Sequence, residues 1–127
     1  MTHITLGLAV WRTFRSIGEE LEKAIKESLE MLEIIKEHGL YGDNKYFNGE
    51  KIGMVDIALG SIVYWLGVNE EVLGVKLLQP HKFPRLHKWF QIFQEEPVIK
   101  QNLPDRDKMI IFFKLRRETL EASVAGA

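Results

Sequence analysis

The chain of 127 residues contains no cysteine. It therefore has no disulfide framework, no cysteine nucleophile and no sulfur ligand for a metal ion. A lack of cysteine fits a reducing compartment, so we expect a cytoplasmic protein. The four histidines show no ligand spacing, and we predict no metal site.

The sequence also lacks a strong excess of either charge and any long apolar run. Its 17 Lys and Arg residues stand against 18 Asp and Glu residues, which gives a net charge of -1. Such a balance favours neither nucleic acid nor an anionic membrane as a partner. Apolar runs such as residues 109–113 are far too short to cross a bilayer. We therefore predict a soluble protein with no nucleic-acid partner and no membrane partner.

Strand signals are almost absent as well, because no alternation of apolar and polar residues is sustained. Over residues 19–38, apolar side chains recur at steps of three and four opposite a face of Glu and Lys, which is typical of an amphipathic helix. We predict an all-α fold of roughly five to seven helices. The length and the 46% hydrophobic content suit a single domain over residues 1–127, with a frayed tail over 119–127.

One acid, Asp56, lies among apolar residues in the stretch "IGMVDIALG". If Gly53 is the N-cap of a helix, Asp56 is the third helical residue, and its carboxylate can accept the free N–H of the cap. Ile52 then precedes the cap and Ile57 is the fourth helical residue, the spacing of a hydrophobic staple. We predict a structural role for Asp56 and not a catalytic one.

A staple with an Asp-bearing cap resembles the folding signature of the carboxyl-terminal domain of soluble glutathione transferases. Other stretches resemble the plant tau class of that family, and the similarity runs from about residue 9 to residue 118. In chain order they are "GEELEKAIKESLEML", "YFNGEKIGMVDIALG", "VYWLGVNEEVLGVKLL", "KFPRLHKWFQIF", "PVIKQNLPDRDK" and "FFKLRRE". The resemblance implies an orthogonal helical bundle that lines the pocket for a hydrophobic substrate.

The resemblance covers only one half of such an enzyme. In the family, a thioredoxin-like amino-terminal domain binds glutathione and carries the serine that stabilises its thiolate, and we expect that domain and its glutathione site to be absent from residues 1–127. The resemblance implies that the intact enzyme is a homodimer without a bound cofactor, which conjugates glutathione, as co-substrate, to hydrophobic electrophiles in detoxification. Because the thiolate is the attacking species, we expect the chain alone to be inactive.

The resemblance also places the residues of the substrate pocket on three segments. They are Gly7, Trp11 and Phe14 in the first helix, Trp65 in the buried helix, and Phe112, Leu115 and Arg116 in the last helix. Residues 109–113 are apolar on every side, which requires a second contact for this helix. For Trp65 and Phe112, packing in the core and a place in a pocket wall are equally open. We predict no catalytic residue in this chain.

Two further functions remain open on the sequence. The chain could be a non-catalytic helical module that binds hydrophobic ligands, or one that binds a protein partner. An uncovered apolar face around Trp11, Phe14 and residues 109–113 would favour such an interaction surface.

Overall fold

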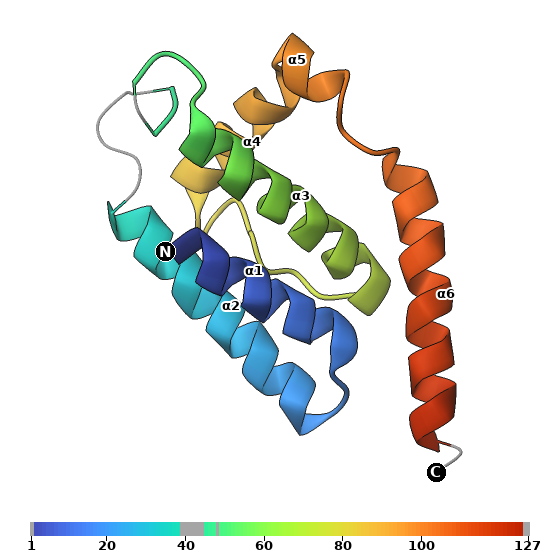
Figure 1. The fold of residues 1–127 in the computed structure, drawn as a ribbon. Helices are drawn as coiled ribbons and strands as arrows, with labels where there is room; N and C mark the ends of the chain where they lie inside the picture. The colour runs from blue at the N-terminus through green and yellow to red at the C-terminus, as the bar shows by residue number, and fades with distance from the viewer. Residues whose placement is uncertain (1, 39–44, 48, 126–127) are drawn as a thin grey trace.

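A computed structural model of the chain describes residues 2–38, 45–47 and 49–125. These residues form six α-helices, and the only strand-like pairing among them is an isolated antiparallel bridge between Tyr46 and Gly49. The helices, drawn in Figure 1, are α1 (Thr2–Arg15), α2 (Glu19–His38), α3 (Met54–Leu73), α4 (Pro84–Glu95), α5 (Pro97–Lys100) and α6 (Arg106–Ala125). The predicted all-α class and number of helices are confirmed.

Helices α1 and α2 lie side by side and run in opposite directions (Figure 1). The apolar stripe of α2 turns toward the core, where Ala24, Leu32 and Ile35 are buried. Ser28 is buried in the same stripe, and its hydroxyl donates a hydrogen bond of 3.0 Å to the carbonyl oxygen of Ala24. A polar residue is tolerated there because its hydroxyl is satisfied within its own helix.

Helix α3 lies at the centre of the fold and contacts α1, α4 and α6. Its residues Leu59, Val63 and Leu66 belong to the main hydrophobic core. The helix ends at Gly74, which adopts the left-handed conformation with φ 71° and donates its N–H to the carbonyl oxygen of Glu70 at 2.8 Å. Although α3 is largely buried, no helix in the described ranges has the length and hydropathy needed to span a bilayer.

Helix α4 closes the core with a regular aromatic stripe. It begins at Pro84. The first N–H groups of a helix have no partner within the helix, so the N–H that proline lacks costs no hydrogen bond there. Leu86, Trp89 and Phe93 are buried, and the rings of Trp89 and Phe93 stack with their centroids 5.8 Å apart. The short helix α5 then leads the chain toward α6 (Figure 1).

The frayed tail over residues 119–127 stays a prediction. The helix continues through residues 119–125, and 126–127 lie outside the described residues. Arg117 joins α6 to α1, because its buried guanidinium donates from Nη1 to the carbonyl oxygen of Phe14 at 2.8 Å and from Nε to Glu121 at 3.0 Å. A cation thus fastens this half of α6 to α1, which hydrophobic periodicity cannot reveal.

Candidate functional site

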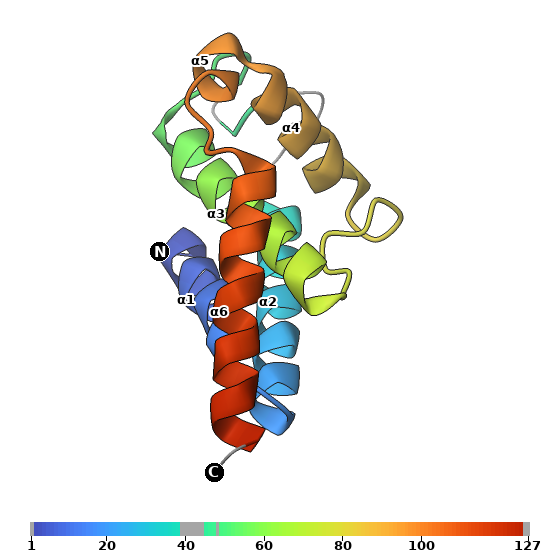
Figure 2. The same ribbon diagram turned by 90° about the vertical axis from the view of Figure 1, so that its right-hand side faces the viewer.

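A groove of about 400 Å³ lies between α1 and α6. The two helices come together in Figure 2, where α6 passes in front of α1. Aromatic rings make most of the groove walls, and each helix adds one guanidinium group. The lining residues are Trp11, Phe14 and Arg15 from α1, and Phe112, Phe113, Arg116 and Leu120 from α6.

Ring contacts join the two walls of the groove. Phe14 on α1 meets Phe113 on α6 nearly edge-on, with centroids 4.8 Å apart. Along each helix the contacts continue, from Trp11 to Phe14 at 5.8 Å and from Phe112 to Phe113 at 5.3 Å. Tilted and edge-to-face contacts of this kind are favourable for aromatic pairs. The groove therefore has a continuous aromatic lining that could hold an apolar ligand.

Four of the seven predicted pocket residues line this groove, namely Trp11, Phe14, Phe112 and Arg116. Trp11 is 42% exposed and Phe112 is 52% exposed, although both are large apolar side chains. Of the two interpretations left open for Phe112, the structure thus places it in the wall and not in the core.

Trp65 lies behind the lining. Its ring contacts those of Trp11 and Phe113, with centroids 5.6 Å and 6.4 Å away, but it is not among the lining residues. Its Nε1 is buried and has no hydrogen-bond partner within the part of the chain that the structure describes. Trp65 thus supports two rings of the groove.

Gly7 and Leu115 also lie outside the lining, for different reasons. A Cβ atom at Gly7 would stand 3.5 Å from Cδ1 of Ile62, an ordinary van der Waals distance, so Gly7 lies at the packing of α1 on α3. Leu115 is 59% exposed. At 3.6 residues per turn, the lining residues of α6 share one face of the helix, and Leu115 lies outside that face.

Three lining residues, Arg15, Phe113 and Leu120, were missed by the sequence analysis. A signal for two of them exists, because Arg15 follows Trp11 by four residues and Leu120 follows Arg116 by four. Residues at this spacing share a helix face.

Asp56 forms the predicted cap and two further hydrogen bonds. Gly53 is the N-cap of α3, and its N–H donates to Oδ2 of Asp56 at 2.9 Å. Oδ1 of the same carboxylate accepts from the N–H of Phe47 at 3.1 Å and from the indole N–H of Trp89 at 2.9 Å. The fully buried carboxylate is therefore occupied by structural partners.

The side chains around this cap are unequally buried. Ile52 is half-buried and packs against the hydrophobic core, whereas Ile57 is 40% exposed. The hydrophobic staple between these two residues stays a prediction. Because Gly53 has no side chain, only the half of the capping box that Asp56 supplies can form.

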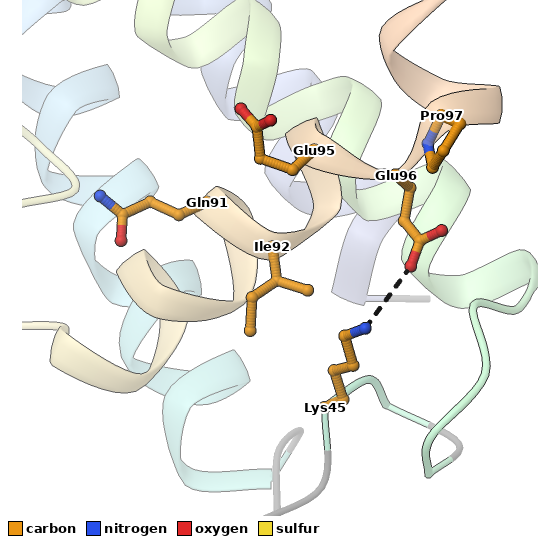
Figure 3. A pocket seen from close by; sticks show the side chains of 6 residues that line it. All are labelled: Lys45, Gln91, Ile92, Glu95, Glu96 and Pro97. Carbon is orange, nitrogen blue, oxygen red and sulfur yellow. Dashed lines mark ion pairs between the residues drawn. The ribbon is translucent and has the colours of Figure 1, made fainter.

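A second hollow, of about 620 Å³, lies where α4 meets α5 (Figure 3). Lys45, which precedes α3 in the chain, reaches toward Glu96, with its Nζ 3.8 Å from Oε1 of Glu96, as the dashed line in Figure 3 marks. Glu96 also accepts a hydrogen bond from the hydroxyl of Tyr46, and Glu95 pairs with Lys100 at 3.4 Å. The charges here compensate one another, so this hollow ties the loop to the helices and is the weaker candidate for a ligand site.

The groups with perturbed protonation lie away from the groove. Burial and the hydrogen bond to Glu96 raise the pKa of the Tyr46 hydroxyl, and burial raises the pKa of the Tyr64 hydroxyl and that of the Glu70 carboxyl. None of these three residues lines the groove, whose only ionisable lining residues in the described ranges are Arg15 and Arg116. Arginine stays protonated in proteins, so the groove can bind but has no general acid or base near neutral pH.

Comparison with known proteins identifies the family. Residues 2–97 match the family model described as "Glutathione S-transferase, C-terminal domain". The chain belongs to this family. The recognition based on the sequence motifs is therefore confirmed, and the six helices are those of a glutathione S-transferase C-terminal domain.

Curated plant proteins are similar to this glutathione S-transferase domain over about half of their length. A "Probable glutathione S-transferase" of Glycine max is 39% identical over 116 residues, which are 91% of this chain and 51% of that protein. "Glutathione S-transferase U8" of Arabidopsis thaliana is 37% identical over 107 residues, or 84% of this chain and 47% of that protein. The chain thus spans about half the length of these curated relatives.

Solved structures agree with this assignment. The tau-class glutathione S-transferase of mango, Mangifera indica, superposes with a TM-score of 0.77 at 34% identity, covering 85% of this chain and 50% of that one. A rice glutathione S-transferase, solved in complex with glutathione, has a TM-score of 0.69 over 93% of this chain and 55% of that one, and at 23% identity it supports the fold alone. The chain corresponds to the carboxyl-terminal half of a tau-class enzyme.

Proposed function

We propose that residues 1–127 are the hydrophobic-substrate domain of a cytoplasmic, tau-like enzyme that conjugates glutathione to hydrophobic electrophiles in detoxification. The observation that carries this proposal is the aromatic groove between α1 and α6. Its volume of about 400 Å³ suits one small molecule, since ligand pockets typically measure about 300–1,000 Å³.

In this proposal the groove holds the electrophile and a second domain supplies the nucleophile. Conjugation needs the glutathione thiolate beside the electrophilic atom, and the gain from such positioning is large. The lining of the groove offers apolar contacts and two arginines, with no side chain to deprotonate a thiol. A thioredoxin-like domain, with glutathione bound, would complete the site, and the assembled enzyme would be a homodimer as in the family.

A chimeric enzyme tests the proposal. The amino-terminal half of the mango tau-class enzyme is joined to residues 1–127, and conjugation of glutathione to chlorodinitrobenzene is measured. We expect turnover by the chimera and none by the 127-residue chain alone, which should also fail to bind glutathione in calorimetry. In the chimera, Phe14→Ala and Phe112→Ala should raise KM by removing groove surface, while Met54→Ala, at a 78% exposed position outside the lining, should leave it unchanged.

Two results would contradict the proposed function. If the chimera folds and binds glutathione but shows no turnover above that of the mango half alone, the groove does not serve conjugation. Turnover by the 127-residue chain alone, abolished by denaturation, would contradict the assignment of thiol activation to a second domain.

A non-catalytic ligand-binding module is the second candidate. One observation favours it: the groove lining offers aromatic rings and two arginines but no side chain that could deprotonate a thiol. A chimera that binds the electrophile at the groove, yet never conjugates it, would support the binding module over the transferase domain.

A further inference from the structure

One hydroxyl of α6 follows two consecutive arginines in the stretch "LRRETL". Thr119 has Arg116 three positions before it and Arg117 two positions before it. The residue is exposed, and it does not line the groove. No other serine or threonine of the chain has an arginine at either of these two positions, so Thr119 is distinguished by its sequence surroundings.

Arginines at these positions are a recognition signal for arginine-directed protein kinases. Such enzymes select their substrates by charge, with acidic side chains beside the bound chain. A guanidinium suits them, because its planar fork donates two parallel hydrogen bonds to one carboxylate. The stretch therefore combines an acceptor hydroxyl with the charge pattern that this class of kinase selects.

The end of α6 is held by few contacts. Within residues 118–125 no side chain is buried, and only Leu120 is half-buried. The hydroxyl of Thr119 donates a hydrogen bond of 2.9 Å to the carbonyl oxygen of Leu115, which lies in the same helix. A segment with so little buried surface opens locally at a low cost in free energy. Thr119 can thus leave the helix and enter the active site of an enzyme that binds extended chains.

Arg117 couples this opening to recognition. In the closed helix its buried guanidinium donates to the carbonyl oxygen of Phe14 at 2.8 Å and to Glu121 at 3.0 Å. Arg116 is exposed, and no ion pair involves it within the described ranges. Opening of the helix end frees Arg117 from its partners, so both arginines are available to a kinase only in the open state.

We infer that Thr119 is a phosphorylation site for an arginine-directed protein kinase, which reaches it when the end of α6 opens. Oγ1 of Thr119 attacks the γ-phosphorus of ATP, the bond from that phosphorus to its bridging oxygen breaks so that ADP leaves, and the hydroxyl proton passes to the catalytic aspartate of the kinase. The product carries about two negative charges at neutral pH. Arg116, one turn earlier on the same face, can pair with this phosphate once the helix has formed again.

Phosphate transfer to the whole folded chain tests the inference. The chain is incubated with ATP and the catalytic subunit of cyclic-AMP-dependent protein kinase, an arginine-directed enzyme, and mass spectrometry identifies the modified residue. We expect phosphate on Thr119. Ser123 is the internal control, since this exposed residue of the same helix has Leu120 and Glu121 at the two positions and should stay unmodified.

Two charge variants locate the recognition. Arg116→Gln should lower the rate at Thr119 by at least about tenfold, as the loss of one charge-assisted contact would give. Lys114→Gln removes the same charge from an exposed position of the same helix, outside the pair of arginines, and should leave the rate unchanged. Both substitutions are repeated in a peptide of residues 113–123, which is too short for a stable helix in water, so the comparison does not depend on folding of the variants.

A third variant tests the opening of the helix end. Glu121→Gln removes one partner of Arg117 and leaves both arginines in place. The rate should rise about threefold in the chain, because the open population grows by the contribution of a partly exposed ion pair. In the peptide, which has no helix to open, the same substitution should leave the rate unchanged.

Three outcomes would contradict the inference. Equal phosphorylation of Ser123 and Thr119, or an unchanged rate for Arg116→Gln in chain and peptide, would overturn recognition through the arginines. A chain that stays unmodified while the peptide reacts would show that the fold withholds Thr119. An equal change by Glu121→Gln in chain and peptide would assign the effect to contact with the kinase and refute the opening. None of these results bears on the proposed function, which conjugation by the chimera tests separately.

Discussion

The indole N–H of Trp89 on α4 donates a hydrogen bond of 2.9 Å to Oδ1 of Asp56 on α3, and both side chains are fully buried. The other oxygen of the same carboxylate caps α3 by accepting the N–H of Gly53. One acid therefore begins a helix and joins it to the next. Since a buried charge is costly without hydrogen bonds, the acid and its donors depend on one another.

Replacement of Asp56 should strongly destabilise the fold. We expect Asp56→Asn to lower the free energy of unfolding by about 3 kcal/mol, because the new amide NH₂ group must face an N–H donor. Trp89→Phe keeps a large ring but loses one donor, and should cost about 1 to 2 kcal/mol. Urea unfolding of both variants measures these losses.

A double-variant cycle separates the hydrogen bond from general damage to the core. The combined variant should lose at least about 1 kcal/mol less than the sum of the two single losses. Asp105→Asn is the control, since this exposed acid also accepts a backbone N–H at the start of a helix, and it should cost below about 0.5 kcal/mol. Strict additivity of the two core substitutions would contradict the coupling of Asp56 to Trp89.

The end of α6 should depend on a single side chain. Arg117→Gln removes the donor to the carbonyl oxygen of Phe14 and the partner of Glu121. We expect residues 118–125 to lose amide protection in hydrogen exchange, with a loss of global stability of about 2 kcal/mol. Lys114→Gln, at an exposed position on the same helix, should leave the exchange pattern unchanged. Equal protection in both variants would show that Arg117 does not fasten the helix.

The features that sequence could predict are the local ones. The period of residues 19–38 and the three-residue step from Gly53 to Asp56 need no knowledge of distant segments. In contrast, the contact between Arg117 and Phe14 joins residues that are 103 positions apart, and no local pattern announces it. The groove could be predicted only in part. The sequence motifs identified some lining residues on each helix, but only the packing of α6 on α1 shows which helix faces meet.

The Glu70 carboxyl should make stability fall as pH rises. Burial raises its pKa above the ordinary 4.5, despite the hydrogen bond from the N–H of Leu77 at 2.8 Å. Below pH 4.5 the group is protonated in both states and has no effect. Above that value the unfolded chain releases its proton while the folded carboxyl keeps it, so stability falls as pH rises toward the folded pKa. Above the folded pKa the buried group is charged as well, and the full loss of stability remains.

Comparison with Glu70→Gln measures this contribution. The amide keeps one acceptor oxygen for Leu77 and carries no charge, so the variant should gain stability relative to the parent as pH rises from 4 to 8. Urea midpoints across this range give the difference. Glu71→Gln, at the exposed neighbouring position, should follow the parent at every pH. A constant difference between Glu70→Gln and the parent would refute the assignment.

Two glycines of α3 should respond to alanine in opposite directions. A Cβ atom at Gly60 would stand 2.4 Å from the ring of Phe93, which is 1% exposed and stacked on Trp89. Because that ring has no room to move, Gly60→Ala should cost about 1 to 3 kcal/mol. At Gly67 the nearest atom is Nη1 of Arg106, 3.4 Å away at the tip of a flexible side chain, so Gly67→Ala should stabilise the helix by up to about 1 kcal/mol.

Thermal unfolding of these two variants checks the close packing of α3 on α4. The same substitution in the same helix should lower Tm at Gly60 and raise it at Gly67. A shorter side chain at the contact provides the rescue, since Phe93→Leu opens space and should make Gly60→Ala less costly than it is in the parent. If Gly60→Ala raises Tm as Gly67→Ala does, then Phe93 does not press against α3, and the glycine is free of any packing requirement.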